Sequence, residues 1–361
     1  MNSIKSLNRY SEDYQTVLLN TFGEWNYFKN YNKDIKFLDL FLAKKFNINN
    51  NITGFIKSRI YYIIIGIFSF KSLFSVIKKD RPDYIIIHLL TFIPLILLFL
   101  FNFQTKFILR ISGYPKLNLF RKILWKLISK KIHKVFCPTK ETMASLESNN
   151  IFSKDKFFLL EDPVIEISKI IKLRDQEIPN ILLNKKYLLA IGRLSVQKNF
   201  ELLLSFFKDE TSKDPSLYLA IAGEGEQKKK IEKLIKNYNL ENKVLLLGYQ
   251  NNIHNLLKNC YCFILTSLWE DPGFVLVESA INNANIISSD CASGPKEIIS
   301  YGKGGLLFKS NDINSLKVKF DIFKRLSKDE LYTLKICSKK IASNYTKFRH
   351  FKKLNNFFNA N

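Results

Sequence analysis

The sequence is poor in the side chains that hold metals and form cross-links. Among 361 residues there are five cysteines and four histidines. The cysteine number is odd, and no two cysteines are spaced as Cys-x-x-Cys. These counts argue against a disulfide-stapled scaffold and a zinc ribbon. We therefore expect a reducing cytoplasmic setting and no bound metal.

Acidic residues are scarce relative to basic ones. The chain has 32 Asp plus Glu against 56 Lys plus Arg, a formal net charge of +24. Such an excess predicts an anionic partner, which could be nucleic acid, an acidic membrane surface or phosphorylated small molecules. The aromatic residues lie mostly in apolar runs, and no RNP-like or helix-turn-helix pattern occurs. We therefore do not expect nucleic acid to be the partner.

The length and the hydrophobic content suit two globular domains. The chain is 47% hydrophobic and 24% charged, so it can bury substantial cores. The opening residues, MNSIKSLNRYSEDYQ, are polar, and we expect no cleaved signal peptide.

Residues 84–103, YIIIHLLTFIPLILLFLFNF, are as long and apolar as a transmembrane helix. Pro94 lies near the middle of this run, however. Its β-branched start follows Arg81-Pro82-Asp83, as a buried parallel strand would. We expect a strand, a turn and a short helix that is buried or lies on a membrane, in preference to a membrane span.

Basic charge is most concentrated in residues 106–140, where no acidic residue occurs. Within this stretch, LFRKILWKLISKKIHK (119–134) has apolar residues at helical spacing and a basic opposite face. Two interpretations remain open, a helix lying on anionic lipid or a lysine-rich solvated face that covers a sheet.

Short apolar runs alternate with helical patterns, which predicts α/β units with parallel sheets. The expected strands are 14–19, 35–39, 83–87, 106–111, 156–160, 187–191, 217–222, 243–247, 262–266 and 284–288. The pattern breaks at 164–185, so we place domains at 1–175 and 176–342, with a C-terminal helix in 343–361 crossing back to the first. Two doubly wound, Rossmann-like domains would face a cleft, with ligands at the carboxyl ends of the strands.

Three predicted strands of the second half are each followed directly by a glycine. In YLLAIGRLSVQKN (187–199), Gly192 allows a tight turn, and Arg193 and Lys198 offer positive charge to phosphate oxygens. The other two segments, LAIAGEGEQKKK and VLLLGYQ, are each weak evidence of anything beyond a turn.

The segment TSLWEDPGFVLVESA (266–280) carries two carboxylates, Glu270 and Glu278, on either side of Gly273. Its Pro-Gly pair predicts a turn followed by a helix, which would put Glu278 in the first helical turn. Free N–H groups at a helix start bind phosphate, and a carboxylate there can accept hydrogen bonds from ribose hydroxyls. Taken singly, Glu270 could be a loop carboxylate and Glu278 a residue favoured by the helix dipole.

Taken in this order, the segments make residues 187–308 resemble the retaining glycosyltransferases of the GT-B fold, the family 4 group. GRLSVQK resembles the diphosphate-binding segment of that family, and EDPGFVLVE resembles its Glu-x7-Glu signature. SSDCASGPKEIISYGKGGLLF (288–308) resembles the segment that follows. The resemblance is strongest to members that build bacterial surface polysaccharides from nucleotide sugars.

The resemblance implies roles by position. Arg193 and Lys198 would bind the donor diphosphate and stabilise its developing charge, and Glu270 would hold the hydroxyls of the transferred sugar. Glu278 would hold the ribose hydroxyls. The remaining donor-site residues would be Tyr249, Gln250, Gly273, Phe274, Val275, Leu276 and Val277. The family needs no metal or other cofactor and retains the anomeric configuration.

The first half departs from the family, whose members open with a strand and a glycine-rich loop facing the acceptor. Here the strand expected at 14–19 looks like the family's second. His88 ends an expected strand and is a candidate catalytic residue or a packed core histidine. Ser112 stands where a histidine is common. The residues assigned to the acceptor or membrane side are Arg110, Ser112, Lys116, Arg121, Lys122 and Lys126.

The sequence thus predicts a hexosyltransferase that is peripheral on the inner face of the cytoplasmic membrane. It would move a hexose or N-acetylhexosamine from a nucleotide sugar, expected to be UDP-linked, to a lipid-linked or polysaccharide acceptor. The product would belong to a surface glycan such as lipopolysaccharide, O-antigen or capsule. The alternative is a truncated, non-catalytic relative that binds nucleotide sugars.

Overall fold

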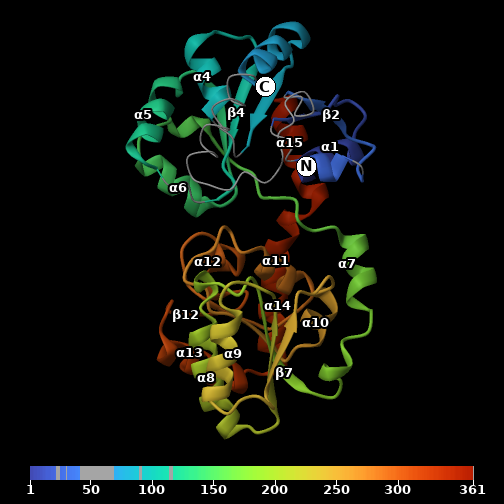
Figure 1. Cartoon of the computed structure of the whole chain (residues 1–361), viewed down its shortest axis with the longest axis vertical. Coiled ribbons are helices and arrows are strands. Elements are labelled where there is room, and N and C mark those ends of the chain that lie inside the picture. Colours follow the sequence, from blue (N-terminus) through green and yellow to red (C-terminus); the bar gives the residue numbers. More distant parts are fainter. Residues whose placement is uncertain (22–24, 30, 41–68, 89–91, 114–116, 361) are drawn as a thin grey trace. The chain divides into compact units, whose positions relative to one another are not determined.

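The computed structural model describes residues 1–21, 25–29, 31–40, 69–88, 92–113 and 117–360. The chain divides into two compact units (Figure 1). The first unit is Met1–Asp162 together with His350–Asn361, and the second is Pro163–Arg349. The sequence placed the boundary at 175/176. The observed division falls earlier because α7 (Ile167–Arg174) packs against α10 (His254–Asn259) of the second unit.

The strands of the first unit form two parallel sheets. One pairs β1 (Val17–Asn20) with β2 (Lys36–Asp39). The other has the order β3 (Tyr84–Ile87), β4 (Lys106–Arg110), β5 (Ile132–Cys137) and β6 (Phe157–Leu159). Because these four strands follow chain order with right-handed connections, their helices share one face of the sheet. These helices are α4 (Phe92–Leu100), α5 (Leu119–Ile128) and α6 (Lys140–Ser148) (Figure 1).

The long apolar run forms a strand and a helix, as predicted. Its β-branched start is β3, and Phe92–Leu100 form α4, which carries Pro94 in its first turn and buries its inward side chains. The predicted turn falls on residues 89–91, outside the described residues. Across the residues that the structure describes, no helix is both long and apolar enough to cross a bilayer.

The predicted helix over 119–134 is wrong beyond residue 128. The helix α5 ends at Ile128, and the N–H of Lys131 donates to the Ile128 carbonyl in a closing turn. Ile132 then begins β5, which the sequence analysis did not predict as a strand. Ile132 has helical spacing from Ile128, but its side chain belongs to the sheet.

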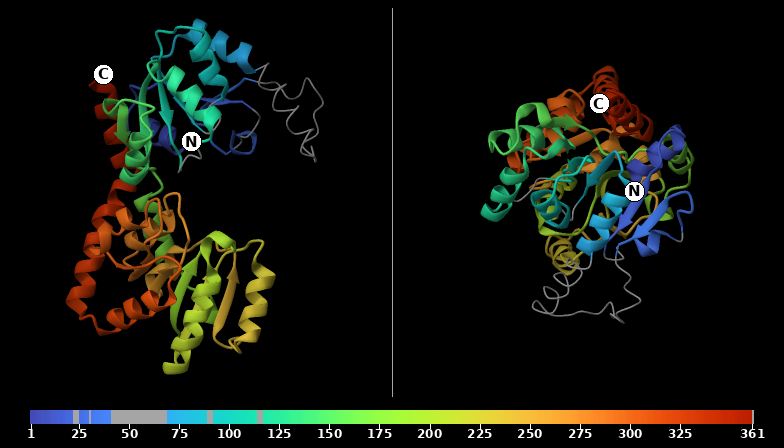
Figure 2. Two further views of the ribbon diagram at one scale, coloured as in Figure 1. Left: turned by 90° about the vertical axis from the view of Figure 1, so that its left-hand side faces the viewer. Right: turned by 90° about the horizontal axis from the view of Figure 1, so that it is seen from above.

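The two faces of the second sheet of the first unit follow strand alternation. Phe107 and Leu109 of β4 pack toward α4 and α5, whereas Ile108 between them belongs to another cluster on the opposite face. That cluster includes Leu354 and Phe357 of α15 (Lys347–Asn359) and a residue of α1 (Asn2–Tyr10). The red helix α15 is seen from two further directions in Figure 2.

The second unit is a doubly wound six-stranded parallel sheet. Its order is β12 (Leu306–Phe308), β11 (Ile286–Ser289), β10 (Cys262–Leu265), β7 (Lys186–Ile191), β8 (Leu217–Ala222) and β9 (Val244–Gly248). The core on one face involves α8 (Phe200–Lys213), α9 (Lys228–Asn237) and α13 (Ile313–Arg325). The core on the other involves α7, α10, α11 (Phe274–Ile281) and α14 (Lys328–Ala342).

The chain enters this sheet in the middle. It proceeds from β7 through β8 to β9, then returns to the other side of β7 for β10, β11 and β12. The topological switch point therefore lies between β7 and β10, where ligands bind in open α/β sheets. No strand was expected from the sequence over the residues of β12.

The remaining elements are short or lie beside undescribed residues. They are α2 (Asn26–Lys29), the helical residues 69–80, η2 (Lys154–Lys156), η3 (Asn180–Leu182), η4 (Val196–Lys198), α12 (Pro295–Ile298), η5 (Ser300–Gly302) and η6 (Ser343–Tyr345).

Candidate functional site

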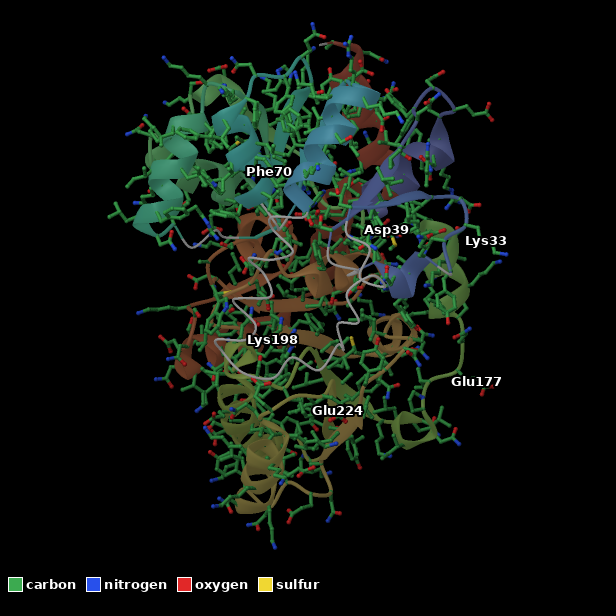
Figure 3. The ribbon with its side chains drawn as sticks, turned by 45° about the horizontal axis from the view of Figure 1, so that its top comes forward. Lys33, Asp39, Phe70, Glu177, Lys198 and Glu224 are labelled. Carbon is green, nitrogen blue, oxygen red and sulfur yellow. The ribbon has the colours of Figure 1, made fainter. Side chains whose placement is uncertain are left out.

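A buried ion pair stands at the switch point of the second unit. Lys198 ends the turn η4 after β7, and Glu270 lies in the loop after β10. Lys198 Nζ is 2.5 Å from Glu270 Oε1, and Ser267 Oγ donates to the same oxygen at 2.5 Å. Glu270 is only 4% exposed. Lys198 is labelled in Figure 3, together with Glu224, which follows β8.

Hydrogen bonds to backbone carbonyls hold the two loops of this pair together. Gln197 Nε2 donates to the Trp269 carbonyl at 2.8 Å, and the N–H of Leu268 donates to the Gln197 carbonyl at 2.8 Å. Thr266 Oγ1 donates to the Lys198 carbonyl at 2.9 Å. The ammonium and the carboxylate are thus carried by two segments that are fixed to each other over several residues.

Two glycines leave space for the side chains of Lys198 and Glu270. A Cβ on Gly192 would lie 2.9 Å from Lys198 Cε, so a larger residue would displace the lysine side chain. Gly273 precedes α11 with φ of +91°, and a Cβ there would lie 3.2 Å from Glu270 Cγ. Both glycines therefore position the Lys198–Glu270 pair as well as their own turns.

Glu278 lies deeper in α11 than the sequence predicted. The helix begins at Phe274 and has no acidic residue in its first turn, so the expectation that Glu278 lies there is wrong. Desolvation by burial raises the pKa of Glu278 to about 7. The N–H groups of Phe274 and Val275 stand at the helix start, where intrahelical acceptors are lacking, whereas the Leu276 N–H donates to the Gly273 carbonyl at 2.9 Å.

The other predicted donor-site residues follow β7 and β9. Arg193 comes two residues after β7 and is exposed. Tyr249 directly follows β9 and is 75% exposed. Gln250 Nε2 donates to the Leu247 carbonyl at 2.6 Å, which fixes that side chain on its own strand. All these residues stand at the carboxyl edge of the parallel sheet.

In the first unit, His88 directly follows β3 and Arg110 ends β4. The pKa of His88 is lowered from its ordinary value, by desolvation first and then by the charges of Arg110 and the amino terminus. The imidazole is therefore neutral near pH 7.

Arg110 is part of the interior and not of the basic surface. It is 4% exposed, and its guanidinium donates to Asp162 Oδ1 at 2.6 Å and to the Leu160 carbonyl at 2.5 Å. The assignment of Arg110 to the acceptor or membrane side thus falls on a buried side chain.

The other residues of the predicted acceptor or membrane side are more scattered. Ser112 is exposed shortly after β4. On α5, Lys122 and Lys126 are exposed, and the guanidinium of Arg121 lies 5.9 Å from the centre of the Trp125 ring. Lys116 lies outside the described residues.

Sequence reasoning missed Ser267 and Asp162. Ser267 stands three residues before Glu270 in the quoted segment, and that proximity was the available signal. Asp162 gave no such signal, because it is 52 residues from Arg110 in the chain. Among the described residues, no group of three or more His, Cys, Asp and Glu side chains could hold a metal ion.

Similarity to solved structures defines the fold class. A glycosyltransferase from Rickettsia africae matches with a TM-score of 0.75 at 17% identity, over 99% of this chain and 93% of that one. An Anabaena protein, HepE, crystallised with UDP, matches with a TM-score of 0.73 at 14% identity, over 99% and 95%. The chain has the GT-B glycosyltransferase fold of parallel α/β units.

The match to a known protein family falls within the second unit. Residues 172–334 match the family described as glycosyl transferases group 1. A glycosyltransferase of Methanocaldococcus jannaschii is 34% identical over 266 residues, 65% of each chain. A Campylobacter jejuni relative named N-acetylgalactosamine-N,N'-diacetylbacillosaminyl-diphospho-undecaprenol 4-alpha-N-acetylgalactosaminyltransferase is 31% identical over 199 residues, 55% of this chain and 53% of that one. The chain thus matches one half to two thirds of the length of these relatives.

Proposed function

We propose that this protein is a retaining hexosyltransferase of the family 4 type. It transfers a sugar from a UDP-linked donor to a lipid-linked or polysaccharide acceptor in surface glycan synthesis. The observation that carries the proposal is the Lys198–Glu270 pair at the switch point. The names of relatives support the acceptor class, since the Campylobacter protein is named for a diphospho-undecaprenol acceptor.

The donor would span the carboxyl edge of the second sheet. The diphosphate would lie against Arg193, Lys198 and the first N–H groups of α11, where positive potential collects. Glu278 would accept hydrogen bonds from the ribose. The base would reach toward Tyr249 after β9, which is two strands from β7 or roughly 10 Å.

In the transfer step, the bond between the anomeric carbon and the diphosphate oxygen breaks, and an acceptor oxygen attacks from the same face. The acceptor proton passes to the leaving diphosphate. Arg193 and Lys198 stabilise the charge that develops on that diphosphate. Glu270 would orient the sugar hydroxyls, and neutral His88 could accept a hydrogen bond at the acceptor side. The proposed chemistry uses no metal or other cofactor.

A non-catalytic nucleotide-sugar-binding protein is the second candidate. One observation favours it: among the described residues, the strands of the first unit form two separate sheets, β1–β2 and β3–β6. The described strands of the first unit, which would bind the acceptor, thus do not form one continuous sheet. The strands of the second unit do.

The test is a thermal-shift panel of UDP, GDP, ADP and UDP-N-acetylhexosamines in the presence of a chelator, followed by transfer assays with polyprenyl-diphosphate sugars. A ligand that binds the native state raises its melting temperature. We expect selective stabilisation by a uridine nucleotide, and turnover reduced about 100-fold in Arg193→Ala. Lys233→Ala, on the exposed face of α9, is the control. Nucleotide binding without turnover would support the second candidate, and no binding would remove both.

A further inference from the structure

The outward face of α5 is apolar, although the helix belongs to a charged stretch. Leu119 is 75% exposed, Phe120 62%, Ile123 52% and Leu127 59%. At 100° per residue these four side chains fall within about 100° of arc. The opposite side of the helix carries Trp125 and Ile128, which are buried in the core. The exposed apolar residues are therefore additional to those that anchor the helix.

This apolar face continues onto α4. The ring of Phe92, at the start of α4, lies 6.1 Å from the ring of Phe120. At the other end, Phe99, Leu100 and Phe101 are all exposed. We call the eight exposed residues Phe92, Phe99, Leu100, Phe101, Leu119, Phe120, Ile123 and Leu127 the apolar ridge.

A basic hollow adjoins the ridge where α4 and α5 end and β4 and β5 begin. It is open and has a volume of about 480 Å³. Its lining includes one acidic residue, Asp155, and five lysines, which are Lys106, Lys130, Lys131, Lys134 and Lys156. Lys122 and Lys126 add exposed cations along α5 itself.

Hydrogen bonds fix two of these lysines as helix caps. Lys131 Nζ donates to the Leu98 carbonyl at 2.7 Å, near the end of α4. Lys156 Nζ donates to the Ser129 carbonyl at 2.7 Å, just after α5. Desolvation, followed by the charges of Lys106, Lys134 and Lys156, lowers the pKa of His133 in the same hollow. The hollow is therefore a region of positive potential in which two of the lysines are held by hydrogen bonds.

We propose that the apolar ridge and the basic hollow together dock the first unit on an anionic phospholipid bilayer. The ridge enters the boundary between headgroups and acyl chains, and the lysines bind lipid phosphates in the hollow and along α5. An apolar strip flanked by lysines is the pattern of a helix that lies in a membrane interface. This goes beyond the proposed function, whose lipid-linked acceptor class would place the protein at a membrane, and it rests on the exposed residues of the ridge and the lysines of the hollow.

The first test is co-sedimentation with vesicles of phosphatidylcholine alone or with about 30% phosphatidylglycerol. We expect binding to the anionic vesicles that weakens as salt rises. Ile123→Asp with Leu127→Asp should reduce it at least tenfold. The control is Val318→Asp with Ile336→Asp, because these second-unit helix residues are similarly exposed, at 56% and 49%.

The second test separates charge from apolar insertion. Lys122→Glu with Lys130→Glu should reduce binding to anionic vesicles about tenfold or more, since each lysine near such a surface adds to the affinity. Lys229→Glu with Lys233→Glu on α9 makes the same charge change elsewhere. UDP binding, measured by calorimetry without lipid, reports the donor site independently, so loss of either activity is distinguishable from loss of the other.

The proposal is overturned if the wild-type chain does not bind anionic vesicles at low salt, or if the ridge variant binds as well as its control. It is also overturned if the wild-type chain self-associates and the ridge variant is monomeric without a change in vesicle binding. The ridge would then be an interface between copies of the chain.

Discussion

Glu270 is held by two donors on a single carboxylate oxygen, the Lys198 ammonium and the Ser267 hydroxyl. A buried carboxylate keeps its charge only where such partners replace water. The second oxygen is left for another ligand, which in the proposed function is a sugar hydroxyl. The orientation of Glu270 therefore depends on a serine that has no chemical role of its own.

Ser267→Ala should lower kcat about tenfold with little change in KM, because the carboxylate loses a donor that orients it. Steady-state kinetics with the donor identified by thermal shift would measure this. Ser267→Thr should restore most of the activity, since it keeps the hydroxyl. Ser212→Ala removes a hydroxyl that donates to the Lys208 carbonyl and is the control. Equal kinetics in Ser267→Ala and wild type would contradict the positioning role.

Glu278 should make stability depend on pH. Its pKa rises from an ordinary 4.5 to about 7 in the folded protein because burial disfavours the charged form. The folded state thus holds a proton that the unfolded state loses first, and this contribution to stability is full below about pH 4.5 and declines until about pH 7. It amounts to about 3 kcal/mol at most. Urea unfolding of wild type and Glu278→Gln from pH 5 to 8 measures it, and identical pH slopes would refute it.

The same carboxyl should couple nucleotide binding to pH. A ribose hydroxyl donates best to the ionised carboxylate, so UDP affinity should rise between pH 6 and 8 and be flatter in Glu278→Gln. Calorimetry in buffers of different ionisation enthalpy would also detect proton release on binding. If the UDP affinity of the wild type did not change with pH, Glu278 would not be a nucleotide-binding residue.

At the scale of the element, Gly273→Ala should distort the start of α11 and displace Glu270. Two costs combine, the positive φ of +91° and the 3.2 Å approach to Glu270 Cγ. Gly302→Ala is a matched control, because Gly302 has φ of +95° and nothing within 4 Å of its added Cβ. The control should lose about 1 kcal/mol of unfolding free energy, and Gly273→Ala should lose more and also lose turnover. If both variants lost the same unfolding free energy and Gly273→Ala kept normal turnover, the loop would accommodate the added methyl group without displacing Glu270.

Helices and strands could be predicted from the sequence where the hydrophobic pattern was strong and ended at residues typical of a turn. The strand β3 and the helix α4 were predicted inside a run of membrane-span length because its β-branched start favours a strand and Pro94 argues against one unbroken helix. The strand β5 was missed because its first residue, Ile132, continues the helical spacing of α5.

The site was predictable where its residues lie in one short segment. Glu270 and Glu278 lie eight positions apart, and Lys198 was paired with them through the family resemblance. The sequence could not give the depth of Glu278 in α11, since a helix start depends on the turn at Gly273. Nor could it give the burial of Arg110, because Asp162 is brought to it only by the sheet.

At the scale of the whole molecule, the first unit depends on residues from the far end of the chain. Phe357 of α15 is 4% exposed and its ring lies 5.1 Å from that of Phe136 on β5. Phe357→Ala should destabilise the first unit by about 3–5 kcal/mol, because it leaves a cavity in that core. Phe348→Ala is the control, because Phe348 lies on the same helix and is 53% exposed. Hydrogen exchange of the β4 and β5 amides measures the effect, and equal protection in both variants would contradict it.

The position of α15 also sets an order of events during synthesis. The second unit closes with Arg349, whereas the first needs Leu354 and Phe357, which leave the ribosome later. Domains made first usually fold first, but here the unit that begins the chain is the last whose interior can be completed. While translation proceeds, the Ile108 face of its sheet lacks the cover of α15, so nascent chains should be a chaperone substrate until α15 is released.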